Sequence, residues 1–122
     1  MKLIIWFLIL LLWGMCLAIL FAPLDHIQYA RAESIPDIVE RVAYQYKVSP
    51  KKMLKVMKCE SNLNPNAELH TKWEDSIGIS QINLKAHKDV TLEQAKDPEF
   101  AATFMAKEFS KGNSKIWTCA RI

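Results

Sequence analysis

The sequence has 122 residues and a formal net charge of +3, and 51% of its residues are hydrophobic. This length leaves room for one small domain. The charge is mild and no basic run is interleaved with aromatic residues, so nothing in the composition points to nucleic-acid binding.

The opening stretch is strongly apolar. No residue between Lys2 and Asp25 is charged, and residues 3–24 are rich in Leu, Ile, Phe and Trp. As a helix this stretch would extend roughly 33 Å, enough to cross the hydrocarbon core of a bilayer. It is also longer than the apolar part of most cleaved signal peptides. These features predict a helix that anchors the protein in a membrane.

A cleaved signal peptide is an equally supported interpretation of the N-terminus. Residues 30–32 (Ala-Arg-Ala) have the small-x-small form of a cleavage site, although they lie well past the apolar stretch. A buried helix of a soluble domain is a third, less favoured interpretation. We therefore expect residues 1–32 to be a signal peptide or membrane anchor with a spacer. Residues 33–122 would then lie outside the cytoplasm, in the periplasm or at the cell surface.

Two cysteines, Cys59 and Cys119, remain after Cys16, which lies inside the apolar stretch. An even pair in an oxidising compartment predicts a disulfide. The bridge would close a loop of about 60 residues and stabilise the fold by on the order of 4 kcal/mol in the chain-entropy model. Two buried free thiols are the alternative. Without a histidine at a suitable spacing the pair predicts no metal site.

Helix signals begin after residue 33. Ser34 and Pro36, and then Ser49 and Pro50, place a capping serine within two residues of a proline that suits a first helical turn. Apolar residues follow at helical spacing and predict the buried face of each helix. They are Ile38, Val39, Val42, Ala43 and Tyr46 in the first helix, and Met53, Leu54 and Met57 in the second.

Two more helices are predicted near the C-terminus. Residues 91–94 (Thr-Leu-Glu-Gln) have the form of a capping box, and residues 97–98 (Asp-Pro) begin another helix that Gly112 ends. No convincing hairpin is evident, and residues 78–83 fit a short strand or a turn. The sequence therefore predicts a mainly α-helical domain over residues 33–122.

The segment 58–83 lacks the steady apolar spacing of a core element, and loops on a rigid scaffold commonly carry functional sites. Glu60 falls near the end of the second predicted helix, where the helix dipole disfavours an ionised carboxylate. A carboxyl group that keeps its proton can act as a general acid. An exposed helix-end glutamate without such a role is the alternative.

Several motifs in this segment are similar to those of the lysozyme-like superfamily. They are residues 60–61 (Glu-Ser), 64–67 (Asn-Pro-Asn-Ala) and 78–83 (Gly-Ile-Ser-Gln-Ile-Asn). Together they resemble the soluble-type lytic transglycosylase (SLT) domain over about 25 residues, and animal-type lysozymes over the same span. The resemblance implies a small lysozyme-like helical domain that cleaves peptidoglycan.

The resemblance also implies roles for single residues. Glu60 matches the catalytic acid, and Ser61 matches the serine beside it that supports the substrate or the acid. Gly78 matches a tight turn at the floor of the cleft. Gln81 matches a glutamine that lines the sugar-binding cleft, and Asn83 extends that floor.

A second catalytic carboxylate is less evident. Animal-type lysozymes have an aspartate where this sequence has Ser76, and the later Ala-Tyr-Asn motif of the transglycosylases is missing. Asp75 is a possible second carboxylate, and Asp75 with Glu74 keeps a hydrolytic mechanism open. The transglycosylase resemblance implies instead that one glutamate acts first as acid and then as base, forming a 1,6-anhydro product.

Two further residues of the segment have alternative interpretations. Trp73 either stacks on a sugar ring as part of the substrate-binding site or covers the core from a loop. His70 is expected to be a surface residue rather than a proton shuttle.

From these observations we predict a monomeric lytic transglycosylase that cleaves the MurNAc–GlcNAc bond of peptidoglycan without a cofactor or a metal. A hydrolytic lysozyme (muramidase) that uses Glu60 with Asp75 is the first alternative. A peptidoglycan-binding module without activity is the second. A membrane-anchored structural or partner protein, independent of the segment 58–83, is the third.

Overall fold

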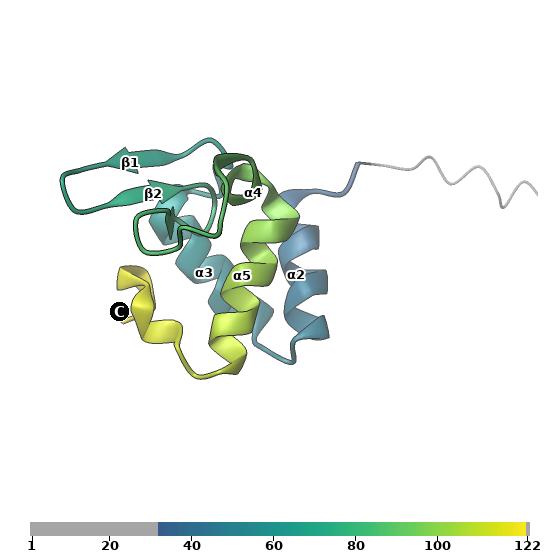
Figure 1. Ribbon diagram of the computed structural model, residues 1–122. Coiled ribbons are helices and arrows are strands. Elements are labelled where there is room, and N and C mark those ends of the chain that lie inside the picture. Colours follow the sequence, from purple (N-terminus) through teal and green to yellow (C-terminus); the bar gives the residue numbers. More distant parts are fainter. Residues whose placement is uncertain (1–31, 122) are drawn as a thin grey trace, which may run out of the picture. The chain divides into compact units, whose positions relative to one another are not determined.

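The computed structural model describes residues 32–121, and the chain from Glu33 onward forms one compact unit (Figure 1). The predicted anchor or signal peptide, residues 1–32, lies outside the described residues apart from its last position. Between residues 32 and 121 no helix is both long enough and apolar enough to cross a membrane.

The first two predicted helices are confirmed. Helix α2 spans Ile35–Gln45 and helix α3 spans Pro50–Ser61. The side chain of Ser34 caps α2 and that of Ser49 caps α3, each by accepting a hydrogen bond from a backbone N–H of the first turn. The fully buried members of their predicted apolar faces are Val39, Val42, Ala43, Met53 and Met57.

The two C-terminal helices are also confirmed. Helix α4 spans Leu92–Lys96 and begins with the predicted capping box, in which Thr91 and Gln94 bond each other's backbone N–H. Helix α5 spans Pro98–Ser110 and is capped by the side chain of Asp97. Gly112 follows the end of α5 with a φ of +83°, a conformation that favours glycine.

The segment between α3 and α4 contains a small antiparallel sheet. Its strands are β1 (Glu68–His70), β2 (Asp75–Ile77) and β3 (Ile82–Asn83), in the order β1-β2-β3. The expectation that no hairpin is present was wrong, because β1 and β2 form one. All of β1 is exposed and each strand has at most 3 residues, so no alternation of apolar and polar residues marked the hairpin. Residues 78–83 combine the two predicted options, a turn followed by the short strand β3.

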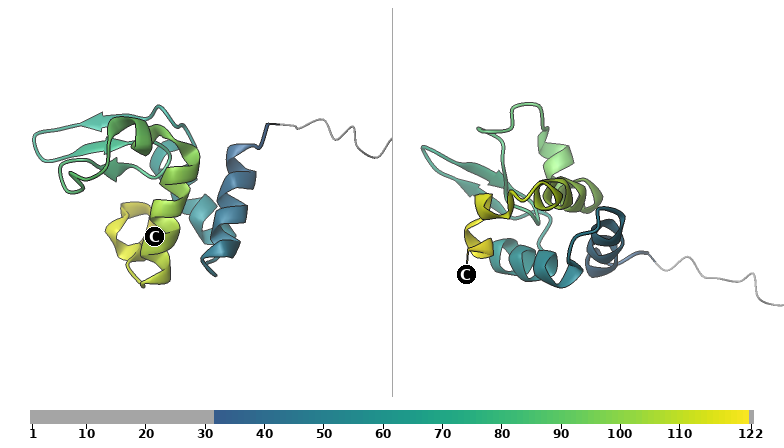
Figure 2. Two further views of the ribbon diagram at one scale, coloured as in Figure 1. Left: turned by 45° about the vertical axis from the view of Figure 1, so that its right-hand side comes forward. Right: turned by 90° about the horizontal axis from the view of Figure 1, so that it is seen from below.

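The core lies between the helices and the inner side of the sheet. Helix α5 packs against α2, and α2 packs against α3. The C-terminal tail forms two short 3₁₀ helices, η2 (Ser114–Ile116) and η3 (Thr118–Ala120), of which η3 lies beside α3 (Figure 2). Trp117, between them, is 5% exposed and packs edge-on against Phe104 and Phe109 of α5. The tail is therefore part of the core.

The predicted disulfide is present. Cys59 and Cys119 are joined at an S–S distance of 2.03 Å, and the bond links the last turn of α3 to the C-terminal tail. The alternative of two free thiols is therefore excluded in this structure.

Replacing both cysteines by serine (Cys59→Ser with Cys119→Ser) is expected to lower the free energy of unfolding by about 2–4 kcal/mol, because the unfolded chain gains conformational freedom. Urea unfolding followed by circular dichroism measures this change, with the oxidised wild type as the reference. The same midpoint in both proteins would show that the packing of Trp117 alone holds the tail.

Candidate functional site

Glu60 lies next to the last residue of α3 and is partly buried. Its Oε1 atom accepts a hydrogen bond from the backbone N–H of Cys119 at 2.9 Å. No partner of the Oε2 atom is found within residues 32–121. Cys119 therefore holds this part of α3 twice, by its backbone N–H to Glu60 and by its sulfur to Cys59. These contacts hold one carboxylate oxygen of Glu60 in place.

Ser61 connects the end of α3 to the turn that follows β2. Its hydroxyl lies 2.9 Å from the carbonyl oxygen of Ile79 and 3.1 Å from that of Met57. Since a hydroxyl has a single proton to donate, the two carbonyls share it. This geometry indicates that Ser61 supports the site by holding two elements together, rather than by facing a ligand.

The turn at residues 78–81 is tightly constrained. Gly78 has a φ of +76°, and a Cβ atom there would lie 2.0 Å from the carbonyl oxygen of Ala95 in α4. The carbonyl of Ala67 accepts hydrogen bonds from the Gly78 N–H at 2.8 Å and from Nε2 of Gln81 at 3.3 Å. Nε2 of Gln81 also donates to the carbonyl of Gly78 at 3.0 Å. The amide nitrogen of Gln81 is thus engaged by the backbone, which fixes the direction of the side chain.

A cavity of about 400 Å³ lies over the sheet and reaches to α5 and the tail. Two predicted site residues, Gln81 and Asn83, line it. The Oδ1 atom of Asn83 accepts hydrogen bonds from the backbone N–H groups of Asp75 and Lys85. The other lining residues are Glu74, Ser76, Ile82, Ala86, His87, Phe104, Glu108, Ile116 and Trp117. The cavity combines apolar walls with a few polar groups, as small-ligand sites commonly do.

Glu60 is not itself among the residues that line this cavity. It is connected to the cavity wall in two ways, through the tail and through Ser61. Nε1 of Trp117, a lining residue, donates to the carbonyl of Ser80 at 2.6 Å, and Cys119 two residues later bonds Glu60. Ser61 bonds the same turn through Ile79. Glu60 and the cavity therefore share the turn 78–81 and the tail as common supports.

Glu74 and Asp75 are adjacent in the sequence, but only Glu74 lines the cavity. Successive side chains of a strand point to opposite faces. Asp75 lies opposite His70 of β1, and its Oδ1 atom lies 2.6 Å from Nδ1 of that histidine. Ser76 and Glu74 line the cavity, and the Ser76 hydroxyl donates to Oε1 of Glu74 at 2.5 Å. The possible second carboxylate predicted from the sequence, Asp75, does not line the cavity, whereas Glu74 does.

Trp73 lies in the loop between β1 and β2 and is 79% exposed. The Lys72 ammonium lies 4.9 Å from the centre of its ring. The interpretation that Trp73 covers the core was therefore wrong. Its predicted stacking on a sugar ring stays a prediction, and Trp73 does not line the cavity over the sheet.

His70 lies on the surface, as predicted. It belongs to a cluster of charged groups on the exposed side of the hairpin. Its two ring nitrogens contact Glu68 at 2.9 Å and Asp75 at 2.6 Å, and Lys96 contacts Glu68 at 2.5 Å. Hydrogen bonds to Glu68 and Asp75 raise the pKa of His70. Hydrogen bonds from Lys96 and His70 lower the pKa of Glu68. The cluster connects the hairpin to α4.

This cluster predicts a pH dependence of stability. Because the pKa of His70 is raised on folding, protonated His70 stabilises the fold fully below its ordinary pKa of about 6.5. That contribution is lost as the pH rises through the higher pKa of the folded state. The difference in melting temperature between wild type and His70→Gln should therefore shrink as the pH rises from 6 toward 9. A constant difference would show that the charge of His70 does not contribute.

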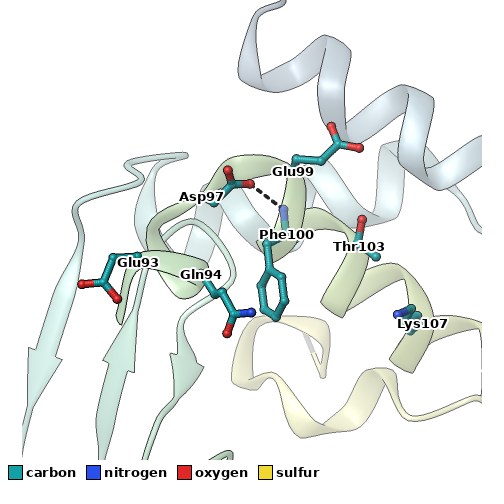
Figure 3. A pocket seen from close by; sticks show the side chains of 7 residues that line it. All are labelled: Glu93, Gln94, Asp97, Glu99, Phe100, Thr103 and Lys107. Carbon is teal, nitrogen blue, oxygen red and sulfur yellow. Dashed lines mark hydrogen bonds between the residues drawn. The ribbon is translucent and has the colours of Figure 1, made fainter. Parts of the chain in front are cut away.

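A second cavity, of about 570 Å³, lies beside α4 and α5, and none of its lining residues was predicted as a site residue (Figure 3). Two of its three lining carboxylates, Asp97 and Glu99, have structural partners. Asp97 accepts from the N–H of Phe100 at 2.7 Å, and Glu99 accepts from Arg41, which lowers the pKa of Glu99. The ring of Phe100 provides an apolar wall. None of the residues that carry the motif resemblance lines this cavity, so the cavity over the sheet remains the candidate site.

Two groups in or beside this site were not predicted from the sequence, because the position of each depends on the tertiary fold. They are the Cys119 backbone N–H, which no sequence motif reveals, and Glu108 of α5, which lies far along the chain from the sheet. Within the described residues no cluster of three or more His, Cys, Asp or Glu side chains is arranged to hold a metal ion. Comparison of the chain with protein-family models, with curated proteins and with solved structures finds no match.

Proposed function

We propose that this chain is a lysozyme-like enzyme that cleaves the glycan strands of peptidoglycan, with Glu60 as its catalytic acid. The observation that carries the proposal is the support around Glu60. A backbone N–H holds one carboxylate oxygen at the end of α3. Ser61 joins this end to the turn 78–81, and that turn and strand β3 contribute Gln81 and Asn83 to the lining of a cavity. The order of elements, a helix with Glu60 in its last turn followed by a small antiparallel sheet, agrees with the motif resemblance in residues 60–83.

The proposed reaction is that of a lytic transglycosylase. Glu60 donates its proton to the oxygen of the MurNAc–GlcNAc bond as that bond breaks. The N-acetyl group of the sugar stabilises the positive charge that develops at C1. The 6-hydroxyl of the same sugar then attacks C1, and Glu60 takes up the hydroxyl proton. The product carries a 1,6-anhydro ring, and Glu60 regains its starting form.

Two observations favour this route over hydrolysis by Glu60 with Asp75. Ser76 occupies the place of the lysozyme aspartate, and Asp75 is bound to His70 outside the cavity. Hydrolysis remains the second candidate because a different carboxylate, Glu74, lines the cavity. A binding module without activity would use the same Gln81 and Asn83 surface and would not need Glu60.

The proposed setting is extracytoplasmic. The apolar stretch in residues 3–24 supports attachment to a membrane or secretion, and the disulfide between Cys59 and Cys119 fits an oxidising compartment. The proposed partner is the peptidoglycan strand, bound by a monomer that needs no cofactor.

The deciding experiment digests purified peptidoglycan with the full chain in mild detergent and identifies the products by mass spectrometry. Anhydro ends support the transglycosylase. Reducing ends alone support a hydrolase. Binding to peptidoglycan without release of fragments supports the binding module and overturns the proposed activity.

A further inference from the structure

Helix α3 presents a row of lysines to the solvent. It contains four lysines and a single acidic residue, Glu60. Lys51, Lys55 and Lys58 follow one another at intervals of four and three residues, which places them on one side of the helix, and Lys52 lies next to them. All four lysines are exposed, and the buried residues of α3 lie on the opposite side. The helix therefore directs its apolar side to the core and its cations to the solvent.

The C-terminal tail extends this surface beyond α3. The short helix η3 packs against α3 (Figure 2), and Nζ of Lys52 donates to Oγ of Ser114 at 3.4 Å. Two more cations lie in the tail, where Nε of Arg121 donates to the carbonyl of Lys115 at 2.8 Å. Both of these residues are exposed. We call the resulting surface the cationic face, and its members are Lys51, Lys52, Lys55, Lys58, Lys115 and Arg121.

The charge of the cationic face is not neutralised by neighbouring carboxylates. Within residues 32–121, none of its six side chains forms an ion pair, and the cations that do are Arg41, His70, Lys96 and Lys111. The carboxylate of Glu60 is engaged instead by the backbone N–H of Cys119. Because the formal net charge of the whole chain is only +3, the six positive charges of this face leave the remainder of the chain net negative. The positive charge is thus concentrated on one face, and such a face attracts anionic partners.

Two features favour a lipid surface as the partner. Ile116 follows Lys115 in the tail and is 53% exposed, so the face combines cations with an apolar side chain. Side chains of these two kinds suit the boundary between lipid headgroups and acyl chains. The second feature is the apolar stretch in residues 3–24, the proposed membrane attachment. Residues 25–32 can extend at most about 29 Å, so a domain attached in this way would stay close to the bilayer.

We propose that the cationic face binds the anionic headgroups of a membrane surface. Lysine and arginine near such a surface are attracted by the lipid phosphates, and salt weakens this attraction by screening it. The inference goes beyond the proposed cleavage of glycan and does not depend on it. A phosphate-bearing polymer of the cell wall offers the same charge, but it would make no use of the exposed Ile116 or of the short connection to the apolar stretch.

The test measures how fast an amine-reactive label modifies each lysine of the full chain, with mass spectrometry as the readout. The protein is reconstituted in vesicles of phosphatidylcholine alone, or of phosphatidylcholine and phosphatidylglycerol in equal parts. We expect Lys55, Lys58 and Lys115 to be labelled several-fold more slowly in the anionic vesicles. Lys107, an exposed lysine of α5, is the internal reference and should be labelled at the same rate in both. Salt at 1 M shortens the screening length to about 3 Å and should remove the protection.

A triple variant, Lys51→Gln with Lys55→Gln and Lys58→Gln, tests whether the lysines of α3 are responsible. These side chains are exposed and glutamine suits a helix as well as lysine does, so the variant should fold, which circular dichroism checks. Removing three cations should weaken docking by about a hundredfold, so that Lys115 loses its protection in anionic vesicles. The matched control, Lys72→Gln with Lys88→Gln and Lys107→Gln, removes the same charge from exposed positions outside the cationic face and should keep Lys115 protected.

Four results would overturn the proposal. They are equal labelling of the cationic face in the two kinds of vesicle, protection of Lys107 as strong as that of Lys115, unchanged protection of Lys115 in the triple variant, and protection by soluble poly(glycerol phosphate) but not by phosphatidylglycerol. The last result would assign the face to a wall polymer. Because no readout involves cleavage, each result leaves the proposed enzymatic function to its own test.

Discussion

Glu60→Gln is expected to abolish glycan cleavage while binding of peptidoglycan is kept. Loss of a general acid costs about two to four orders of magnitude in rate. The amide of glutamine has almost the same shape as the carboxyl group, and its oxygen can accept the same hydrogen bond from the Cys119 N–H. The variant should therefore fold normally and fail only in proton transfer.

Release of muropeptides by the purified variant measures the loss, and a sedimentation assay with insoluble peptidoglycan measures binding. Glu40→Gln is a suitable control, because Glu40 is an exposed glutamate on α2. Muropeptide release by Glu60→Gln at the rate of wild type would exclude Glu60 as the acid. Loss of binding together with cleavage would instead indicate that the carboxylate mainly holds the substrate.

Gly78→Ala is expected to destabilise the fold strongly. The φ of +76° costs an L-residue about 1–2 kcal/mol. The new Cβ would also lie 2.0 Å from the carbonyl oxygen of Ala95, so the backbone of the turn or of α4 must move. Overpacking of this kind costs typically about 1–3 kcal/mol more. We therefore expect the free energy of unfolding to fall by about 4 kcal/mol.

Gly112→Ala is the matched control for this prediction. Gly112 has a similar φ of +83°, but a Cβ there would meet no atom within 4 Å. It should therefore cost only the backbone term of about 1–2 kcal/mol. Urea unfolding of both variants separates the clash from the strain. Equal losses in the two variants would show that the contact with Ala95 relaxes without cost.

The Gly78 substitution also bears on the site, because the turn 78–81 supports both of its sides. Ser61 bonds the carbonyl of Ile79, and Nε2 of Gln81 bonds that of Gly78. A shift of this backbone would move the end of α3 relative to Gln81. We therefore expect Gly78→Ala to reduce any glycan cleavage even at temperatures where it remains folded.

Local features of the fold could be predicted from the sequence because their signals lie within a few residues of one another. Serine, threonine or aspartate caps, followed by proline in three cases, mark the start of all four α-helices in the described residues. The disulfide also followed from the sequence, because the two cysteines that remain after Cys16 allow a single pairing. Glu60 at the end of α3 was a prediction of the same local kind.

Which side chains share the cavity was decided by the tertiary structure. The sheet has a period of two residues, so its register alone determines that Glu74 and Ser76 line the cavity while Asp75 pairs with His70. That register depends on a hairpin of exposed, short strands with no apolar pattern to reveal it. The hydrogen bond from the Cys119 N–H to Glu60 joins groups 59 residues apart. Contacts of this range form only when the whole domain packs. The helices could therefore be predicted from local sequence signals, whereas the grouping of side chains around the cavity depends on the tertiary structure.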